Sequence, residues 1–208
     1  MRPHAKLTLF ALLASATATP AAFADVPDPR FSTCEPVIVA TSSGTPLGAP
    51  GEVGTLNVPG YEVVIRDVNN APLAGRLVEI DFTRTTVRLY TAQSPGTTVD
   101  CARRVLAKST GAGGLALFSP RFGGFENSNL VRVYDKGELL CSIRARSTDI
   151  DAMGGTTALG DLALFAQNFL SNQAAQETDF DVSGTTGLTD LVAFAAEFIR
   201  AQSSEYCP

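Results

Sequence analysis

The sequence of 208 residues contains no tryptophan and only one histidine, His4. Tryptophan gives the best surface for stacking on sugars and cations, so the strongest form of that stacking is excluded. His4 lies in a stretch with the features of an export signal, whose removal would leave no histidine. A Ser-His-Asp or Cys-His catalytic set and a histidine-bound zinc ion are then excluded. We therefore expect that the protein is not an enzyme.

Long apolar runs are scarce and occur only near the start of the chain. Residues 1–24 have the pattern of a secretory signal peptide: Arg2 and Lys6, an apolar run over 7–14, and small residues that end in the A-x-A site A-F-A. After residue 24 no run approaches the roughly 20 apolar residues of a membrane span. We expect a protein that is secreted, extracellular or at the cell surface, without a membrane span.

Positive charge is also in short supply, with 16 Lys and Arg against 21 Asp and Glu. Removal of the signal would take away two basic residues and no acidic one, which makes the remainder more acidic. An acidic chain repels a phosphate backbone, so we do not expect nucleic acid as a partner.

Four cysteines lie in the exported part of the chain: Cys34, Cys101, Cys141 and Cys207. An even number in an oxidising compartment predicts two disulfides, with free buried thiols as the alternative. Four cysteines allow three connectivities. We favour Cys34–Cys101 inside the first domain and Cys141–Cys207 as a link from the C-terminal tail to that domain.

Residues 25–147 show the pattern of short strands separated by turns. Val78, Ile80 and Phe82 alternate with Glu79 and Asp81, which is the period of a half-buried strand. Further strands are predicted over 36–40, 61–66, 101–107, 115–118, 130–134 and 139–145. Turn residues rich in Gly, Pro and Asn stand between them. This spacing predicts an antiparallel β-sandwich.

The same region resembles the bacterial immunoglobulin-like domains of surface proteins. The resemblance is carried by Y-E-V-V-I-R-D-V-N-N-A-P-L-A-G-R-L-V-E-I-D-F, which begins at residue 61, and by S-T-G-A-G-G-L-A-L-F, which begins at residue 109. In that family a V-x-V-x-D strand leads to a P-x-x-G turn, and a glycine-containing hairpin precedes a strand that ends in Phe. The resemblance implies an immunoglobulin-like scaffold or spacer.

Residues 148–208 contain an internal repeat. The segment L-G-D-L-A-L-F-A-Q-N-F over 159–169 recurs as L-T-D-L-V-A-F-A-A-E-F over 188–198, 29 positions later. Such self-similarity indicates a duplicated supersecondary unit. In both copies the apolar residues have helical spacing, so we expect a small all-α domain in which each helix follows an acidic loop.

The second loop, D-F-D-V-S-G-T-T-G-L-T-D, has the pattern of an EF-hand-type calcium loop. Calcium needs six to eight oxygens around one point, and glycine allows the sharp turn between them. The predicted ligands are the side chains of Asp179, Asp181, Ser183 and Asp190 and the backbone carbonyl of Thr185. The alternative is that the last aspartate only stabilises the start of a helix.

The first loop, D-I-D-A-M-G-G-T-T-A-L-G-D, is one residue longer because of its paired glycines. Asp149, Asp151 and Asp161 align with ligand positions, whereas Met153 stands where an oxygen is wanted. We predict that this loop is the weaker calcium site or is not a site.

Two calcium-loop-plus-helix units in tandem resemble a type I dockerin, the module that attaches secreted proteins to cohesin receptors. The motif here is D-x-D-x-S-G-x5-D-L-x-x-F. The resemblance implies calcium at the residues named above and a cohesin-like partner. It places partner contact at loop positions 10 and 11, which are Leu188 and Thr189 here and commonly a Ser-Thr pair in the family.

Three functions fit these observations. The first is a secreted, non-catalytic modular protein whose calcium-binding dockerin-like domain mediates assembly or attachment. The second is an accessory or carbohydrate-binding component of polysaccharide degradation, since dockerins are often attached to glycoside hydrolases. The third is a purely structural unit, because the short connection over 146–149 favours contact between the two domains.

Overall fold

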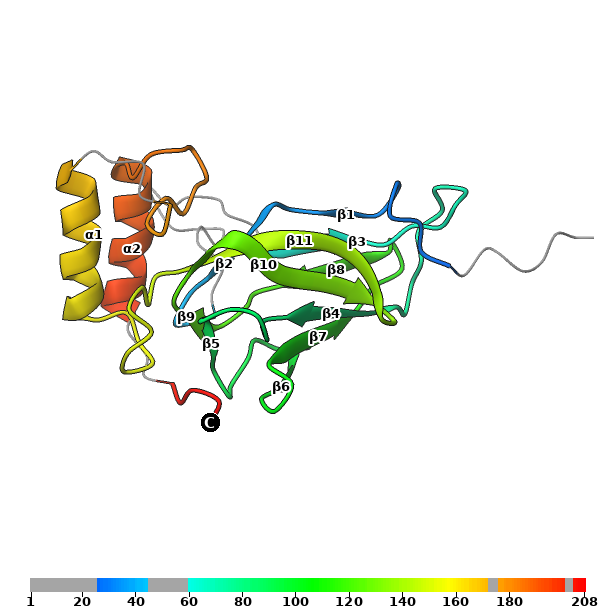
Figure 1. Cartoon of the computed structure of the whole chain (residues 1–208), viewed down its shortest axis with the longest axis horizontal. Coiled ribbons are helices and arrows are strands. Elements are labelled where there is room, and N and C mark those ends of the chain that lie inside the picture. The colour runs from blue at the N-terminus through cyan, green and yellow to red at the C-terminus, as the bar shows by residue number, and fades with distance from the viewer. Residues whose placement is uncertain (1–25, 45–59, 172–175, 201–203) are drawn as a thin grey trace, which may run out of the picture.

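The computed structural model describes residues 26–44, 60–171, 176–200 and 204–208. The predicted signal peptide, residues 1–24, lies outside this part. The described chain is mainly β, with two helices near its C-terminal end (Figure 1). We refer to residues 26–147 as the β region and to residues 148–200 as the helical region.

Within the described ranges the strands are β1 (Thr33–Cys34), β2 (Val37–Ala40), β3 (Tyr61–Val64), β4 (Leu77–Asp81), β5 (Arg88–Leu89), β6 (Thr98–Asp100), β7 (Val105–Ser109), β8 (Leu115–Phe118), β9 (Phe122–Gly123), β10 (Glu126–Asp135) and β11 (Glu138–Ser147). The helices are α1 (Leu159–Ser171) and α2 (Leu188–Arg200). The sequence pattern anticipates each of the longer strands to within a few residues.

Two sheets share one apolar core. The smaller sheet has the order β1-β3-β8, and the larger has the order β2-β11-β10-β4-β7-β6. A third, two-stranded sheet joins β5 to β9. Inward-facing residues of both main sheets, among them Val63 of β3, Ile80 of β4 and Val133 of β10, are fully buried in the same cluster. Alternation along each strand therefore buries one face, as the period-two pattern predicts.

One strand pairing corrects the prediction of a purely antiparallel arrangement. β2 runs parallel to β11, with Val37 opposite Arg144 and Ala40 opposite Ser147. The two strands are about a hundred residues apart in the sequence, so no hairpin fixes their relative direction. The parallel pairing brings the C-terminal ends of both strands to the same end of the sheet, beside the helical region.

The two helices pack through a column of phenylalanine rings. Phe165 of α1 lies against Phe194 of α2, with ring centroids 4.9 Å apart, and against Phe180 at 6.2 Å. All three rings are buried. The repeat thus places the same apolar face of each helix against the other copy, as the helical spacing predicts.

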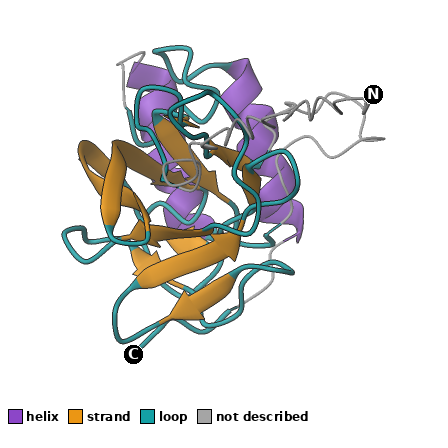
Figure 2. Ribbon diagram, turned by 90° about the vertical axis from the view of Figure 1, so that its right-hand side faces the viewer, coloured by secondary structure: helices purple, strands orange, loops and turns teal. Residues whose placement is uncertain are grey.

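The helical region also contacts the β region directly, and in Figure 2 the two helices lie behind the strands. Glu197 of α2 is fully buried and accepts hydrogen bonds from the Ser43 amide at 3.1 Å and the Ser43 hydroxyl at 2.9 Å. Val39 of β2 packs against the phenylalanine cluster. This contact agrees with the expectation from the short connection over 146–149.

All four cysteines form disulfides, but the pairing that we favoured is wrong. The bonds are Cys34–Cys141 and Cys101–Cys207. Cys34 lies in β1 of the smaller sheet and Cys141 in β11 of the larger one, so the first bond links the two sheets. The amide of Cys207 donates to the Leu89 carbonyl at 2.8 Å, which leads the tail to Cys101 rather than to Cys141.

Candidate metal centre

The loop before α2 brings three carboxylates together. Oxygens of Asp179, Asp181 and Asp190 all lie within 4.8 Å of one another, a grouping that could hold a metal ion. Asp179 and Asp190 are buried. Asp190 holds the loop onto the helix, since its Oδ1 accepts from the Asp181 amide at 3.0 Å and its Oδ2 from the Gly187 amide at 2.8 Å.

Ser183 and Thr185 lie beside this cluster. The Ser183 hydroxyl is 3.4 Å from Asp179 Oδ1 and 3.2 Å from the Thr185 carbonyl oxygen. The Gly184 amide donates to Asp179 Oδ2 at 3.1 Å. Gly184 has a φ of 96°, a conformation that glycine adopts without a steric penalty. The structure therefore brings the five predicted ligand residues of the second loop into one place.

The loop before α1 repeats this geometry. Oxygens of Asp149, Asp151 and Asp161 also lie within 4.8 Å of one another. Asp161 Oδ1 accepts from the Asp151 amide at 3.0 Å, and its Oδ2 accepts from the Ala158 amide at 2.7 Å. These bonds match those of Asp190 to within 0.1 Å. Both final aspartates therefore stabilise a helix start, as in a capping box, and belong to an acidic cluster as well.

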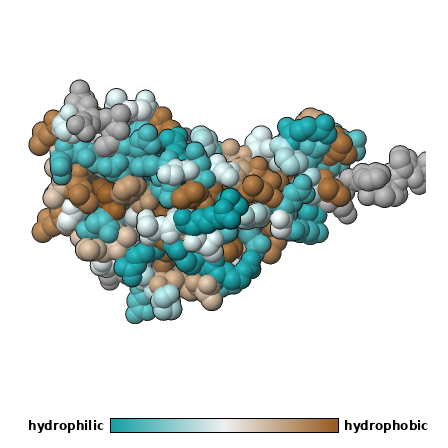
Figure 3. Space-filling view, viewed as in Figure 1, coloured by the Kyte–Doolittle hydropathy of each residue, from teal (hydrophilic) through white to brown (hydrophobic). Residues whose placement is uncertain are grey.

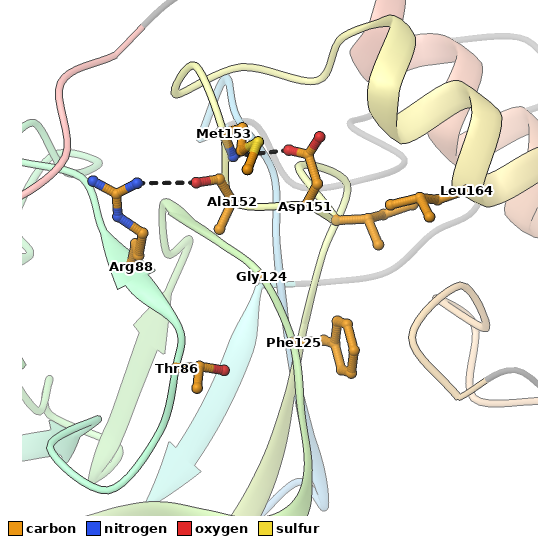
Figure 4. Close-up of a pocket in the computed structure, with 9 residues that line it drawn as sticks. Thr86, Arg88, Gly124, Phe125, Asp151, Ala152, Met153 and Leu164 are labelled. Atoms are coloured by element: carbon orange, nitrogen blue, oxygen red, sulfur yellow. Dashed lines mark hydrogen bonds between the residues drawn. The ribbon is translucent and has the colours of Figure 1, made fainter.

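Met153 occupies the position of the first loop that corresponds to the predicted ligand Ser183 in the second loop. Its side chain is 68% exposed and lines a pocket together with Arg88, Phe125 and Leu164 of α1 (Figure 4). Its amide donates to Asp151 Oδ1 at 2.8 Å. The backbone thus keeps the form of the loop, although this position offers no side-chain oxygen.

Asp149, the first aspartate of the first loop, has one carboxylate oxygen that is hydrogen-bonded and one that is not. The residue is fully buried, and its Oδ2 accepts hydrogen bonds from the hydroxyls of Tyr90 and, at 2.5 Å, Tyr206. Its Oδ1 is buried and accepts no hydrogen bond from the described residues. An orphaned buried carboxylate oxygen is costly, and a cation in the cluster would offset that cost.

Asp179, at the equivalent position of the second loop, is held by a cation. Arg146 of β11 is 1% exposed and places Nη1 3.2 Å from Asp179 Oδ2. The same nitrogen donates to the Asp179 carbonyl. In each loop, therefore, a residue of the β region holds Oδ2 of the first aspartate.

Burial of these carboxylates raises the pKa of four of them. Burial, followed by the charges of Asp161 and Asp151, raises the pKa of Asp149 to about 6 even though two tyrosine hydroxyls stabilise its anion. Burial likewise raises the pKa of Asp161 and Asp190. Burial also raises the pKa of Asp179, although Arg146 opposes the shift. The negative charge of each cluster is therefore poorly compensated by the protein alone.

Comparison with known proteins found no matching family, no matching curated protein and no matching solved structure.

Leu188 and Thr189, the predicted partner-contact residues, are both exposed at the start of α2. Leu188 is 72% exposed, and Thr189 hydrogen bonds to the Asp181 carboxylate. Sequence reasoning missed Tyr90 and Tyr206 as supports of the first cluster. Tyr90 and Tyr206 lie 59 and 57 residues from Asp149, so no local pattern could reveal them.

Two further observations bear on the environment of the protein. No helix of the described chain is long and apolar enough to cross a membrane. The two disulfides are compatible with an extracellular protein.

Proposed function

We propose that this chain is an exported, non-catalytic protein whose two acidic loops bind calcium and whose helical region docks on a cohesin-like receptor. The observation that carries the proposal is the pair of three-carboxylate clusters, each at the start of a repeated helix. The β region, with its two packed sheets, serves as an immunoglobulin-like scaffold in this proposal.

Calcium is favoured over other metals by the chemistry of the donors. Each cluster offers carboxylate oxygens, and the second adds a hydroxyl and a backbone carbonyl, whereas histidine and thiolate are absent from both. Hard oxygen donors suit calcium, and zinc prefers nitrogen and sulfur. We expect affinities near those of extracellular modules, about 10⁻⁴ to 10⁻³ M, since neither loop has a full set of carboxylates.

The proposed mechanism is metal-coupled folding. Calcium, when bound, supplies the positive charge that the three carboxylates of each loop lack. Asp161 and Asp190 transmit the order of each loop to its helix through the bonds to Ala158 and Gly187. The helices in turn hold the phenylalanine rings of both copies in one cluster.

The exposed apolar side chains of the helices support docking. Leu159 and Leu188 are 73% and 72% exposed, and Leu170 and Ile199 are 81% and 84% exposed. The members of each pair are 29 positions apart, so the repeat preserves the same exposed positions. Figure 3 shows hydrophobic atoms on the outer side of the helical region, at the left. Exposure of Leu188 favours a docking face over a purely internal structural unit.

The test is binding of the purified mature chain to immobilised cohesin domains, with calcium and with EDTA. We expect calcium-dependent binding that Leu188→Asp weakens at least tenfold and that Leu139→Asp leaves unchanged. Leu139 is a matched control because it is 43% exposed and lies on β11 in the β region. Calcium binding without capture by any cohesin would contradict the docking part of the proposal.

A further inference from the structure

The C-terminal tail, residues 204–208, lies across the first loop and is bonded to the β region. The Ser204 amide donates to the Gly155 carbonyl at 2.9 Å, and the Thr91 amide donates to the Glu205 carbonyl at 2.9 Å. The Cys101–Cys207 disulfide then joins the tail covalently to the turn that follows β6.

The tail places Tyr206 against the first acidic cluster. The Tyr206 hydroxyl donates to Asp149 Oδ2 at 2.5 Å, whereas the buried Oδ1 accepts no hydrogen bond from the described residues. The ring is held by Arg88, whose guanidinium carbon lies 4.0 Å from the ring centroid, and by Tyr90, with ring centroids 5.0 Å apart. Arg88 also donates to the Ala152 carbonyl of the loop at 3.2 Å (Figure 4).

The additional glycine of the first loop makes room for the tail. A Cβ atom on Gly155 would lie 1.8 Å from the Ser204 carbonyl oxygen, so another side chain there would displace the tail. Glycine is also required in the β region where it faces the tail, because a Cβ atom on Gly123 of β9 would lie 2.7 Å from the Tyr206 hydroxyl. The absence of a side chain at Gly155, the second of the paired glycines, thus allows the tail to lie against the first loop.

We infer that the disulfide-bonded tail is part of the first metal site, in which Tyr206 is a positioning residue that orients Asp149 toward calcium. The inference rests on the proposed calcium function. Residues that orient a metal ligand from outside the coordination shell affect metal affinity by about 10- to 100-fold. The first loop therefore depends on the Cys101–Cys207 bond, whereas the second depends on Arg146, so one site can be weakened without the other.

The experiment compares two disulfide-lacking variants by calcium titration calorimetry. Cys101→Ser with Cys207→Ser releases the tail, and Cys34→Ser with Cys141→Ser is the matched control. The two bonds span 106 and 107 residues, so their loss has nearly the same effect on the entropy of the unfolded chain. We expect the first variant to lose at least tenfold in affinity at one of two sites, and the control to change either site less than twofold.

A second pair of variants keeps both disulfides. Tyr206→Phe removes only the hydroxyl that contacts Asp149, and we expect about a tenfold loss at one site. Tyr61→Phe is its control, because the Tyr61 hydroxyl donates to the Glu35 carbonyl, away from both loops. Terbium in place of calcium adds a spectroscopic signature: tyrosine-excited terbium emission should fall in the Cys101 and Cys207 variant, which retains every tyrosine.

The outcomes separate the inference from the function on which it rests. Unchanged affinity in the Cys101 and Cys207 variant, or an equal loss in both disulfide variants, would overturn the role of the tail and leave the calcium proposal intact. Failure of the native protein to bind calcium or terbium would overturn the calcium proposal and the inference with it.

Discussion

Asp149 and Asp179 begin the two acidic loops, and each is held through one carboxylate oxygen by residues outside its loop. Neutral hydroxyls of Tyr90 and Tyr206 hold Asp149, and the cation of Arg146 holds Asp179. The first cluster is therefore the more negative of the two. The absence of a side-chain oxygen at Met153 disfavours calcium binding by the first loop, whereas the larger uncompensated negative charge favours it. These two effects oppose each other in the expectation that the first loop is the weaker site.

Arg146→Met tests the charge balance of the second loop. Removing one partner of a buried ion pair costs about 3 to 5 kcal/mol, and we expect a loss of this size in EDTA. The loss should be smaller in saturating calcium, which supplies positive charge to the cluster. Urea denaturation in both conditions measures it.

The control for this substitution is Arg103→Met. Arg103 is 62% exposed and pairs with Glu79 at 3.1 Å, so its loss should change the free energy of unfolding by less than about 1 kcal/mol. An Arg146→Met variant as stable as the native protein in EDTA would show that Asp179 does not need this cation.

Glu197 gives the contact between the two regions a dependence on pH. Burial raises the pKa of Glu197 above its ordinary value of 4.5, against the hydrogen bonds from Ser43 and Ser42 and the charge of Arg121. The native state therefore binds this proton more tightly than the unfolded state does. The contribution of Glu197 to the free energy of unfolding is fully present below about pH 4.5 and is lost as the pH rises through the raised pKa.

The variant Glu197→Gln lacks this titration. We expect the stability of the native protein relative to the variant to be greater at pH 4.5 than at pH 7.5, by urea denaturation in EDTA at both values. If the difference in the free energy of unfolding between the native protein and the variant is the same at both pH values, Glu197 does not titrate in this interval.

At the scale of the elements, the two repeated loop–helix units have the same geometry but different surroundings. α1 buries Asp161 and Phe165, whereas α2 buries Asp190, Ala193, Phe194 and Glu197. Among the additional buried residues of α2, Glu197 accepts hydrogen bonds from the β region and Ala193 belongs to the phenylalanine cluster. The residues that the copies share, an aspartate in the first turn and a phenylalanine four positions later, are those that form the cluster and the common core.

Phe165→Ala tests that common core. Phe165 stacks on Phe169, Phe180 and Phe194, and truncation of a buried phenylalanine costs about 3 to 5 kcal/mol. We expect a lower melting temperature and weaker calcium binding, because both helices lose their common contact. Phe125→Ala, at a residue 39% exposed, is the control and should cost much less. Equal effects of the two substitutions would contradict this role of the ring column.

The elements with a clear period were predictable from the sequence. The strand over 115–118 and both helices are found where the apolar spacing places them. Strands of two or three residues, such as Arg88–Leu89 and Thr98–Asp100, are too short to show a period. The parallel pairing of β2 with β11 and the pairing of the cysteines depend on contacts between distant segments, which no local pattern encodes.

At the scale of the whole molecule, the site and the scaffold are physically joined. Arg146 and Ser43 reach the helical region from the adjacent ends of β11 and β2, and the tail returns from the helical region to the β region. The acidic loops lie along this contact. Metal binding is therefore expected to stabilise the association of the two regions as well as each loop.

The central claim is that the two acidic loops bind calcium, and calorimetric titration of the purified protein without residues 1–24 tests it most directly. A melting curve in EDTA and in calcium, together with an Asp179→Ala, Asp190→Ala variant, completes the measurement. The account predicts binding at two sites and a higher melting temperature in calcium, with one site lost in the variant. No heat of binding and the same melting temperature in EDTA and calcium would contradict it.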